Sequence, residues 1–174
     1  QVAGAVMFAL SPVHTNEYFA EKTRQLAASP DVDSILLYDT AGVLEKERLI
    51  GLLPGIVAAA NGKPIEFHAN NLLGMSAKAY LDAVDLGVSV LHTASRPMAN
   101  GPSVPSTEIM VRNIEIKGHS HSLDKSLFQP VADHFRAVGK SAGFLVDQYA
   151  EYDAFSEEHQ IPGGMMGTFK AQLE

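Results

Sequence analysis

A short apolar run occurs four times between residues 2 and 92, and an amphipathic stretch separates each run from the next. Apolar runs of this length are typical of strands buried on both faces of a parallel sheet, and the stretches between them have the apolar spacing of helices. Strands that are joined by helices lie parallel, with right-handed crossovers. We therefore predict an α/β fold with four adjacent parallel strands over residues 2–10, 34–38, 65–68 and 88–92.

Residues that begin and end helices support this division. Thr15 or Asn16 can cap a first helix that Pro30 stops, because a short polar side chain satisfies the free N–H groups of the first turn. Asn61 and Gly62 fit the left-handed turn that ends a second helix. We expect helices over residues 16–29, 45–60 and 75–86, and two more over residues 107–116 and 124–138, after a loop rich in proline, glycine and serine.

Composition limits the classes of partner. The 174 residues are 46% hydrophobic, which suits one domain with one core. The net charge of −7 and the lack of a run of lysine and arginine argue against nucleic acid and anionic membranes. Without cysteine a metal would need His, Asp, Glu, Tyr or backbone oxygen, and no apolar run approaches the ~20 residues of a membrane span. We expect a cytoplasmic protein that acts on a small molecule.

Polar side chains follow the third predicted strand. His68 and Asn70 are two residues apart, so in a strand both side chains point to the same face. The carboxyl ends of parallel strands are where α/β proteins usually bind ligands. A structural histidine that is satisfied by loop asparagines is the alternative on these residues alone.

Five short motifs resemble, in the same order, the carboxyltransferase domain of biotin-dependent enzymes. This family includes pyruvate carboxylase, the oxaloacetate decarboxylase α subunit and the transcarboxylase. The motifs are LSPVHT at residues 10–15, YDTAG at 38–42, HAN at 68–70 with Gly74 and Met75, PSTE at 105–108 and QIPGGM at 160–165. The resemblance implies that residues 1–122 are the C-terminal half, strands five to eight, of a (β/α)₈ TIM barrel. It also implies that residues 123–174 are a helical extension with a Pro-Gly-Gly motif. Sequence upstream of Gln1, a homodimer or a partner chain would then complete the barrel.

The same resemblance shows an altered metal site. The family holds a divalent metal with an aspartate of the first strand, a carbamylated lysine and a His-x-His pair. Tyr38 stands at the lysine position and Asn70 at the second histidine, so only His68 matches. A phenol and an amide are poor ligands for a transition metal. Zinc, manganese or magnesium is therefore expected only at a degraded site. Biotin would have to come from another domain or chain, because no biotin-carrier signature is present.

Other histidines offer a replacement for the lost ligands. His14 and His92 end the first and fourth predicted strands, and with His68 three imidazoles could form a zinc-type site. The alternative is that these histidines form hydrogen bonds without metal. The pair His119 and His121 lies in a polar loop and is interpreted as solvated surface.

These considerations define a predicted site. We assign metal binding to His68 and His92, and catalysis to Tyr38, His68 and Asn70, which could hydrogen-bond an oxyanion in place of a metal. The predicted substrate-binding residues are His14, Asp39, Asn71 and Thr93.

Two classes of function remain open. The resemblance implies an enzyme, a carboxyltransferase or carbon–carbon lyase that makes or breaks a bond beside the carbonyl of a small 2-oxo acid or acyl compound. The loss of family ligands favours instead a non-catalytic or scaffolding subunit that keeps the barrel. A sugar or phosphate isomerase ranks last, because no phosphate-binding loop is recognisable.

Overall fold

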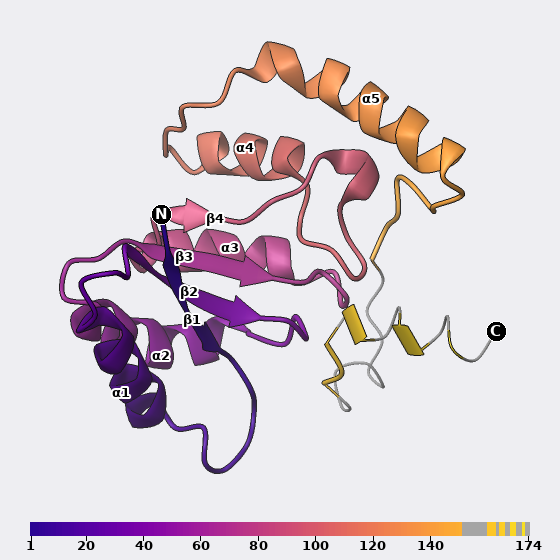
Figure 1. Cartoon of the computed structure of the whole chain (residues 1–174). Coiled ribbons are helices and arrows are strands. Elements are labelled where there is room, and N and C mark those ends of the chain that lie inside the picture. The colour runs from indigo at the N-terminus through magenta and orange to yellow at the C-terminus, as the bar shows by residue number, and fades with distance from the viewer. Residues whose placement is uncertain (151–159, 163, 166–167, 170–171, 173–174) are drawn as a thin grey trace.

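A parallel four-stranded sheet forms the centre of the chain. The computed structural model describes residues 1–150, 160–162, 164–165, 168–169 and 172. The strands follow one another in chain order, and each neighbouring pair is parallel (Figure 1), which confirms the prediction from the repeating units. The strands are β1 (Ala3–Met7), β2 (Ser34–Asp39), β3 (Ile65–Ala69) and β4 (Val90–Leu91).

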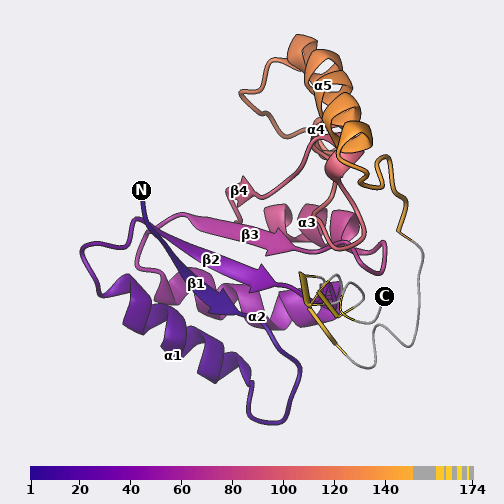
Figure 2. The same ribbon diagram turned by 45° about the vertical axis from the view of Figure 1, so that its right-hand side comes forward.

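Helices connect the strands and cover one face of the sheet. Figures 1 and 2 show α1, α2 and α3 on the same side, in an arc that follows the curvature of the sheet. The chain then leaves the sheet and forms α4 and α5. The helices are α1 (Asn16–Ala27), α2 (Lys46–Ala59), α3 (Ser76–Asp85), α4 (Thr107–Ile116) and α5 (Phe128–Ser141), with 3₁₀ turns η1 (Arg96–Met98) and η2 (Lys125–Leu127).

The predicted helix ends are largely confirmed. Thr15 caps α1, since its hydroxyl accepts a hydrogen bond from the backbone N–H of Tyr18 at 3.2 Å. Asn61 and Gly62 have φ of 52° and 81°, the left-handed turn expected after α2. The last predicted helix begins later, at Phe128, because its first residues form η2.

The two faces of the sheet differ in burial. Residues that point toward the helices, including Ile35, Leu37 and Phe67, have no exposed surface and form one core with α2 and α3. On β1 exposed and buried residues alternate, and Met7 is 56% exposed. The prediction that this strand is buried on both faces is therefore wrong. The helices cover only one face, and the described residues leave the other, which lines the interior of a closed barrel, open at β1.

The fourth strand is shorter than predicted. Only Val90 and Leu91 pair with β3 as a strand, although the backbone N–H groups of Ser89 and His92 donate to Ile65 and Phe67 on either side. A strand that is paired along one edge loses regular geometry at its ends more readily than a central one. The backbone contacts nevertheless hold His92 at the carboxyl end of the sheet, where it was expected.

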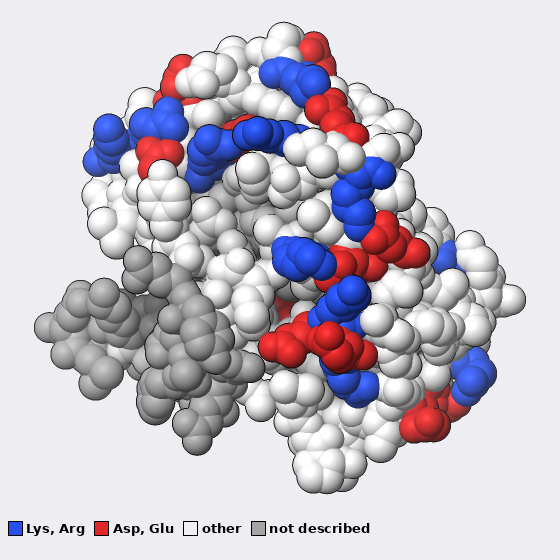
Figure 3. All heavy atoms as spheres, turned by 180° about the vertical axis from the view of Figure 1, so that it is seen from behind, with Lys and Arg blue, Asp and Glu red and all other residues white. Residues whose placement is uncertain are grey.

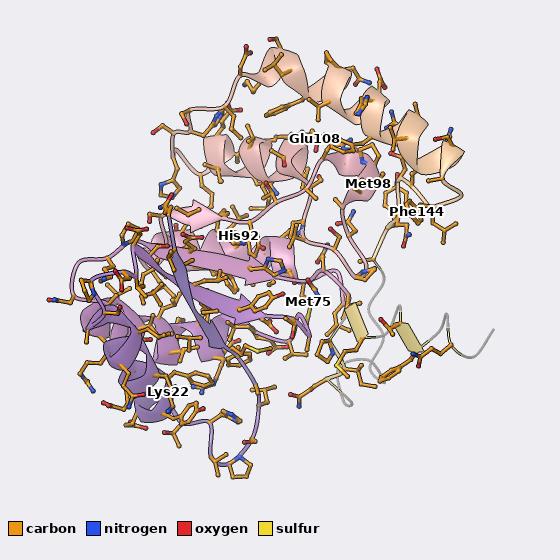
Figure 4. All side chains as sticks on the ribbon, in the orientation of Figure 1. Lys22, Met75, His92, Met98, Glu108 and Phe144 are labelled. Carbon is orange, nitrogen blue, oxygen red and sulfur yellow. The ribbon has the colours of Figure 1, made fainter. Side chains whose placement is uncertain are left out.

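The C-terminal part packs through α5. This helix contacts η1, and Figure 4 shows Met98 of η1 below it and Phe144 just after its end. No strand follows β4 within the described ranges. The boundary between residues 122 and 123 remains a prediction, and Gly163 of the Pro-Gly-Gly motif lies outside the described residues.

Charged side chains of both signs lie on the surface of the chain. On the face seen in Figure 3, acidic and basic side chains are interspersed. Among the described residues, no helix has the length and apolar character needed to cross a membrane.

Candidate functional site

Three predicted site residues meet at the carboxyl ends of β2 and β3. Tyr38 and His68 are register partners, and their rings stand nearly perpendicular with centroids 4.6 Å apart. Asn70 follows His68 on the same face, as the two-residue spacing predicted, and its Oδ1 lies 3.1 Å from His68 Nε2. All three line a cavity of about 460 Å³ together with Thr40 and Ser103. The structure thus brings Tyr38, His68 and Asn70 to one place.

A chain of hydrogen bonds runs across the sheet behind this cavity. His68 Nδ1 lies 3.3 Å from Nδ1 of His92, and the two rings stand edge to face. On its other side, His92 Nε2 lies 2.8 Å from Oε2 of Glu66, whose Oε1 accepts a hydrogen bond from the Ser34 hydroxyl. Figure 4 shows His92 directly after β4, beside β3. This series of hydrogen bonds connects residues of β2, β3 and the end of β4.

The surroundings of Glu66 and His68 determine whether these two side chains are charged. The Ser34 hydroxyl, and with it His92, lowers the pKa of Glu66, so this carboxyl is ionised at neutral pH. Burial lowers the pKa of His68, with a further contribution from His92, while the contact with Asn70 acts in the opposite direction. His68 is therefore neutral at neutral pH and can donate a hydrogen bond through one ring nitrogen only.

Tyr80 fixes the ends of β3 and β4. This α3 side chain has no exposed surface, and its hydroxyl accepts from the N–H of Ala69 at 2.9 Å and donates to the carbonyl of His92 at 2.8 Å. Burial raises the pKa of the Tyr80 phenol further above its usual range, so it remains a donor. One hydroxyl therefore ties together the backbone on either side of the His68–His92 contact.

Asp39 shapes the loop after β2. Its side chain is 1% exposed, and its carboxylate accepts hydrogen bonds from the N–H groups of Gly42 at 2.9 Å and Leu44 at 2.8 Å. Adjacent strand residues point to opposite faces, so Asp39 faces the helices while Tyr38 faces the cavity. The prediction that Asp39 binds substrate is not supported by this placement, because its oxygens are used by the backbone.

Asp39 should make stability depend on pH. Burial raises its pKa to about 6, against the lowering effect of the backbone N–H groups. Because the folded-state pKa lies above that of an unfolded aspartate, near 3.8, the contribution to stability is full below about pH 4 and is lost as the pH rises through 6. We expect the free energy of unfolding of the wild type to fall by about 2 kcal/mol relative to that of Asp39→Asn between pH 4 and 7. Urea unfolding at a series of pH values measures this, and parallel pH curves for the two proteins would contradict it.

Three other predicted residues lie elsewhere. His14 stacks on Phe19, its Nδ1 lies 2.7 Å from the Ser11 hydroxyl, and it lines a neighbouring cavity of about 640 Å³ beside β1, which shares Thr40 with the Tyr38–His68 cavity. Asn71 is buried, and its side chain accepts a hydrogen bond from the backbone N–H of Ser76. This contact stabilises the start of α3. Thr93 pairs with the hydroxyl of Thr107 at 2.8 Å. None of the three lines the Tyr38–His68 cavity.

The donors present do not fit the family's metal. Among the described residues, no group of three or more His, Cys, Asp or Glu side chains is arranged to hold a metal ion. Both ring nitrogens of His68 have partners, and Asn70 Nδ2 donates to the carbonyl of Thr40 at 2.9 Å. His14 does not join His68 and His92, so the three-imidazole site is not formed. The pair His68 and His92 alone supplies two nitrogens, fewer than the protein ligands of a typical zinc site.

The polar loop histidines are placed as predicted. His119 lies 3.4 Å from Asp85 and His121 lies 3.0 Å from Glu115, in contacts near the surface and away from the cavity. Glu66 and Tyr80, by contrast, were missed. The alternation of Glu66 with His68 could have revealed the first, since it places both on the open face, whereas nothing in the sequence pointed to the second.

Comparison with known proteins finds similar sequences and similar solved structures. No protein-family model matches the chain. It is 29% identical over 174 residues to a pyruvate carboxylase subunit of Methanothermobacter thermautotrophicus, covering 99% of this chain and 30% of that protein. It is 30% identical over 172 residues to the methylmalonyl-CoA carboxyltransferase 5S subunit of Propionibacterium freudenreichii, covering 98% of this chain and 34% of that protein.

The solved structures agree in fold. The carboxyl transferase domain of Rhizobium etli pyruvate carboxylase, solved with 3-hydroxypyruvate, superposes with a TM-score of 0.87 at 21% identity, covering 98% of this chain and 29% of that one. The chain spans about a third of the length of the relatives it matches. It is a homologue of the carboxyltransferase domains of biotin-dependent enzymes and has the fold of part of their TIM barrel.

Proposed function

We propose that this chain, together with the rest of its barrel, is an enzyme that makes or breaks a carbon–carbon bond beside the carbonyl of a small 2-oxo acid or acyl substrate. The observation that carries the proposal is the meeting of Tyr38, His68 and Asn70 on one cavity at the carboxyl ends of two strands. Relatives with lower identity are named 4-hydroxy-2-oxovalerate aldolase, which is chemistry of the same kind.

The site can supply the electrophile that this chemistry needs. Breaking a bond next to a carbonyl leaves an enolate, whose oxygen must be stabilised by a metal or by hydrogen-bond donors. The Tyr38 hydroxyl is a donor at the cavity wall, and the one N–H of the neutral His68 ring, which Asn70 Oδ1 accepts in the structure, can be shared with a substrate oxygen. Asn70 holds the His68 ring through Oδ1, while its own amide N–H is bound to Thr40. We therefore assign stabilisation of the oxyanion to Tyr38 and His68, and orientation of His68 to Asn70.

The same relationship supports a proposal about biotin and partner chains. Several of the related proteins are named as subunits, and one R. etli pyruvate carboxylase carboxyl transferase structure was solved with pyruvate and biocytin. We propose that biotin, if the reaction uses it, is presented by another domain or chain. We propose further that a partner chain or a second copy completes the working protein.

A scaffolding role is the second candidate. It is favoured by the donor set, in which one family ligand is retained and both ends of the Asn70 amide are engaged by the protein itself. Such a subunit would keep the barrel surface and have no activity of its own.

Turnover separates the two candidates. We expect the full-length protein, supplied with oxaloacetate, to release pyruvate at a rate above that of the protein-free solution. Pyruvate with a carboxylated biotin derivative tests the reverse transfer. If neither reaction is accelerated, the enzymatic proposal is rejected and the scaffolding role is supported.

A further inference from the structure

We propose that Asn100 is a positioning residue that holds the loop of residues 100–104 as one wall of the Tyr38–His68 cavity. Residues 102–104 of this loop line the cavity, opposite the strand ends that supply the polar side chains. The role of Asn100 in placing the loop is independent of the reaction, whereas its effect on turnover rests on the proposed function.

Close packing is incomplete around this loop. Pro102 and Ser103 line the Tyr38–His68 cavity and also line a second cavity of about 500 Å³. Met98 and Phe144, which Figure 4 labels, belong to the wall of this second cavity. Atoms that border a cavity lack packing partners on that side, so hydrogen bonds have to fix the position of the loop.

Four of these hydrogen bonds meet at Asn100. Its backbone N–H donates to the carbonyl of Val104 at 2.9 Å, and its carbonyl accepts from the N–H of Ser103 at 3.1 Å, which closes the loop. In the side chain, Oδ1 accepts from Nδ2 of Asn71 at 2.8 Å, and Nδ2 donates to the carbonyl of Gln148 at 2.9 Å. Asn100 therefore ties the loop to the residues after β3 and to the segment after α5.

The first of these two anchors is next to the site. Asn71 directly follows Asn70, and its backbone N–H donates to the carbonyl of Ser103 at 2.7 Å. The N–H of Ser76 donates to Oδ1 of Asn71, so the Nδ2 of this amide is the atom that faces Asn100. Asn100 must then present its oxygen to Asn71, which leaves its Nδ2 for the second anchor.

The second anchor is held by α5. Asp147 precedes Gln148, and its N–H donates to the carbonyl of Pro97 at 3.0 Å. Its carboxylate accepts from Nε and Nη2 of Arg136 at 2.7 and 2.9 Å. A bidentate ion pair of this kind fixes orientation as well as distance, so the Gln148 carbonyl is kept within reach of Asn100.

Asparagine suits position 100 for two reasons. The backbone there has φ of 69°, a left-handed conformation that asparagine tolerates better than most residues with a Cβ. Its amide accepts with the oxygen and donates with the nitrogen, whereas aspartate only accepts and glycine has no side chain. An asparagine can therefore serve both anchors from a left-handed backbone.

Amide hydrogen exchange in the full-length protein tests the placement of the loop. Asn100→Gly keeps the left-handed backbone and removes both side-chain bridges. We expect the amides of Ser103 and Asn71 to exchange about tenfold faster in this variant, because the lost hydrogen bonds no longer oppose opening of the loop. Mass spectrometry of peptides that contain these two residues measures the change.

Asn61→Gly is the matched control for this test. Asn61 is also a left-handed asparagine, with φ of 52°, but it lies directly after α2 and lines neither of the two cavities beside the loop. Its replacement should leave turnover and the exchange of Ser103 and Asn71 unchanged. Wild-type exchange rates in Asn100→Gly, or equal acceleration by the two substitutions, would overturn the proposal.

Kinetics show whether the placement of the wall matters for the reaction. If the enzymatic proposal holds, Asn100→Gly should raise KM for oxaloacetate about tenfold with little change in kcat, because a cavity wall contacts the substrate in the ground state and the transition state alike. A variant that merely contained fewer folded molecules would lower kcat and leave KM unchanged. That result would reject the positioning role.

The two measurements separate this inference from the proposed function. Faster exchange in Asn100→Gly, with no turnover in the wild type, would confirm the placement of the loop by Asn100 and reject the proposed function. Turnover in the wild type, with the same exchange rates and the same KM in Asn100→Gly, would support the proposed function and reject the role of Asn100.

Discussion

Gly42→Ala is expected to destabilise the protein by about 3 kcal/mol or more. Gly42 has φ of +69°, and a Cβ built on it would lie 2.2 Å from the backbone oxygen of Asn70. That oxygen accepts the Ser76 hydroxyl at 2.7 Å, so neither the loop nor the start of α3 can move away freely. Displacement of Asn70 would also disturb its contact with His68. Chemical unfolding measures the first effect and turnover the second.

Gly62→Ala is the matched control. Gly62 also has a left-handed backbone, with φ of +81°, but a Cβ there would meet no atom within 4 Å. Gly62→Ala should therefore lower the free energy of unfolding by only about 1 kcal/mol, which is the cost of the left-handed backbone for alanine. Equal destabilisation by the two substitutions would show that the close approach to Asn70 is not what requires glycine at position 42.

His68→Ala is expected to lower the activity of the full-length protein at least about tenfold, roughly 1.4 kcal/mol in transition-state stabilisation. The ring touches Tyr38, Asn70 and His92, and its removal takes away the N–H group at the cavity and leaves Asn70 Oδ1 without this partner. The effect should fall mainly on kcat, since the interaction strengthens as charge develops on the substrate oxygen.

His119→Ala serves as its control. His119 lies near the surface beside Asp85, outside the Tyr38–His68 cavity. Its loss should leave turnover unchanged. Similar losses from the two histidine substitutions would reject the assignment of the site to the cavity at the ends of β2 and β3.

The elements that the sequence predicted well are those governed by local pattern. The span of α4 matches its prediction, and α1 begins at the cap that Thr15 provides, because capping and apolar spacing act within a few residues. Burial of β1 was misjudged, since whether a strand is covered on one face or two depends on distant parts of the fold. The length of β4 depends in the same way on its neighbours.

The same distinction holds for the site: contacts set by local strand geometry could be predicted, and contacts set by the packing of distant residues could not. That His68 and Asn70 share a face follows from strand geometry alone, and the structure agrees. The same alternation could have shown that Asp39 and Tyr38 point to opposite faces. The contact between His68 and His92 joins residues 24 positions apart, and only the packing of β3 against β4 creates it.

We propose that this site works through its own hydrogen-bonding side chains in place of the family's metal. Metal analysis of the full-length protein, combined with oxaloacetate turnover before and after treatment with a chelator, tests it most directly. We predict turnover that persists after metal is removed, because Tyr38 and His68 stabilise the oxyanion themselves. About one tightly bound metal per site, with activity lost on chelation and restored when the metal is returned, would contradict the claim.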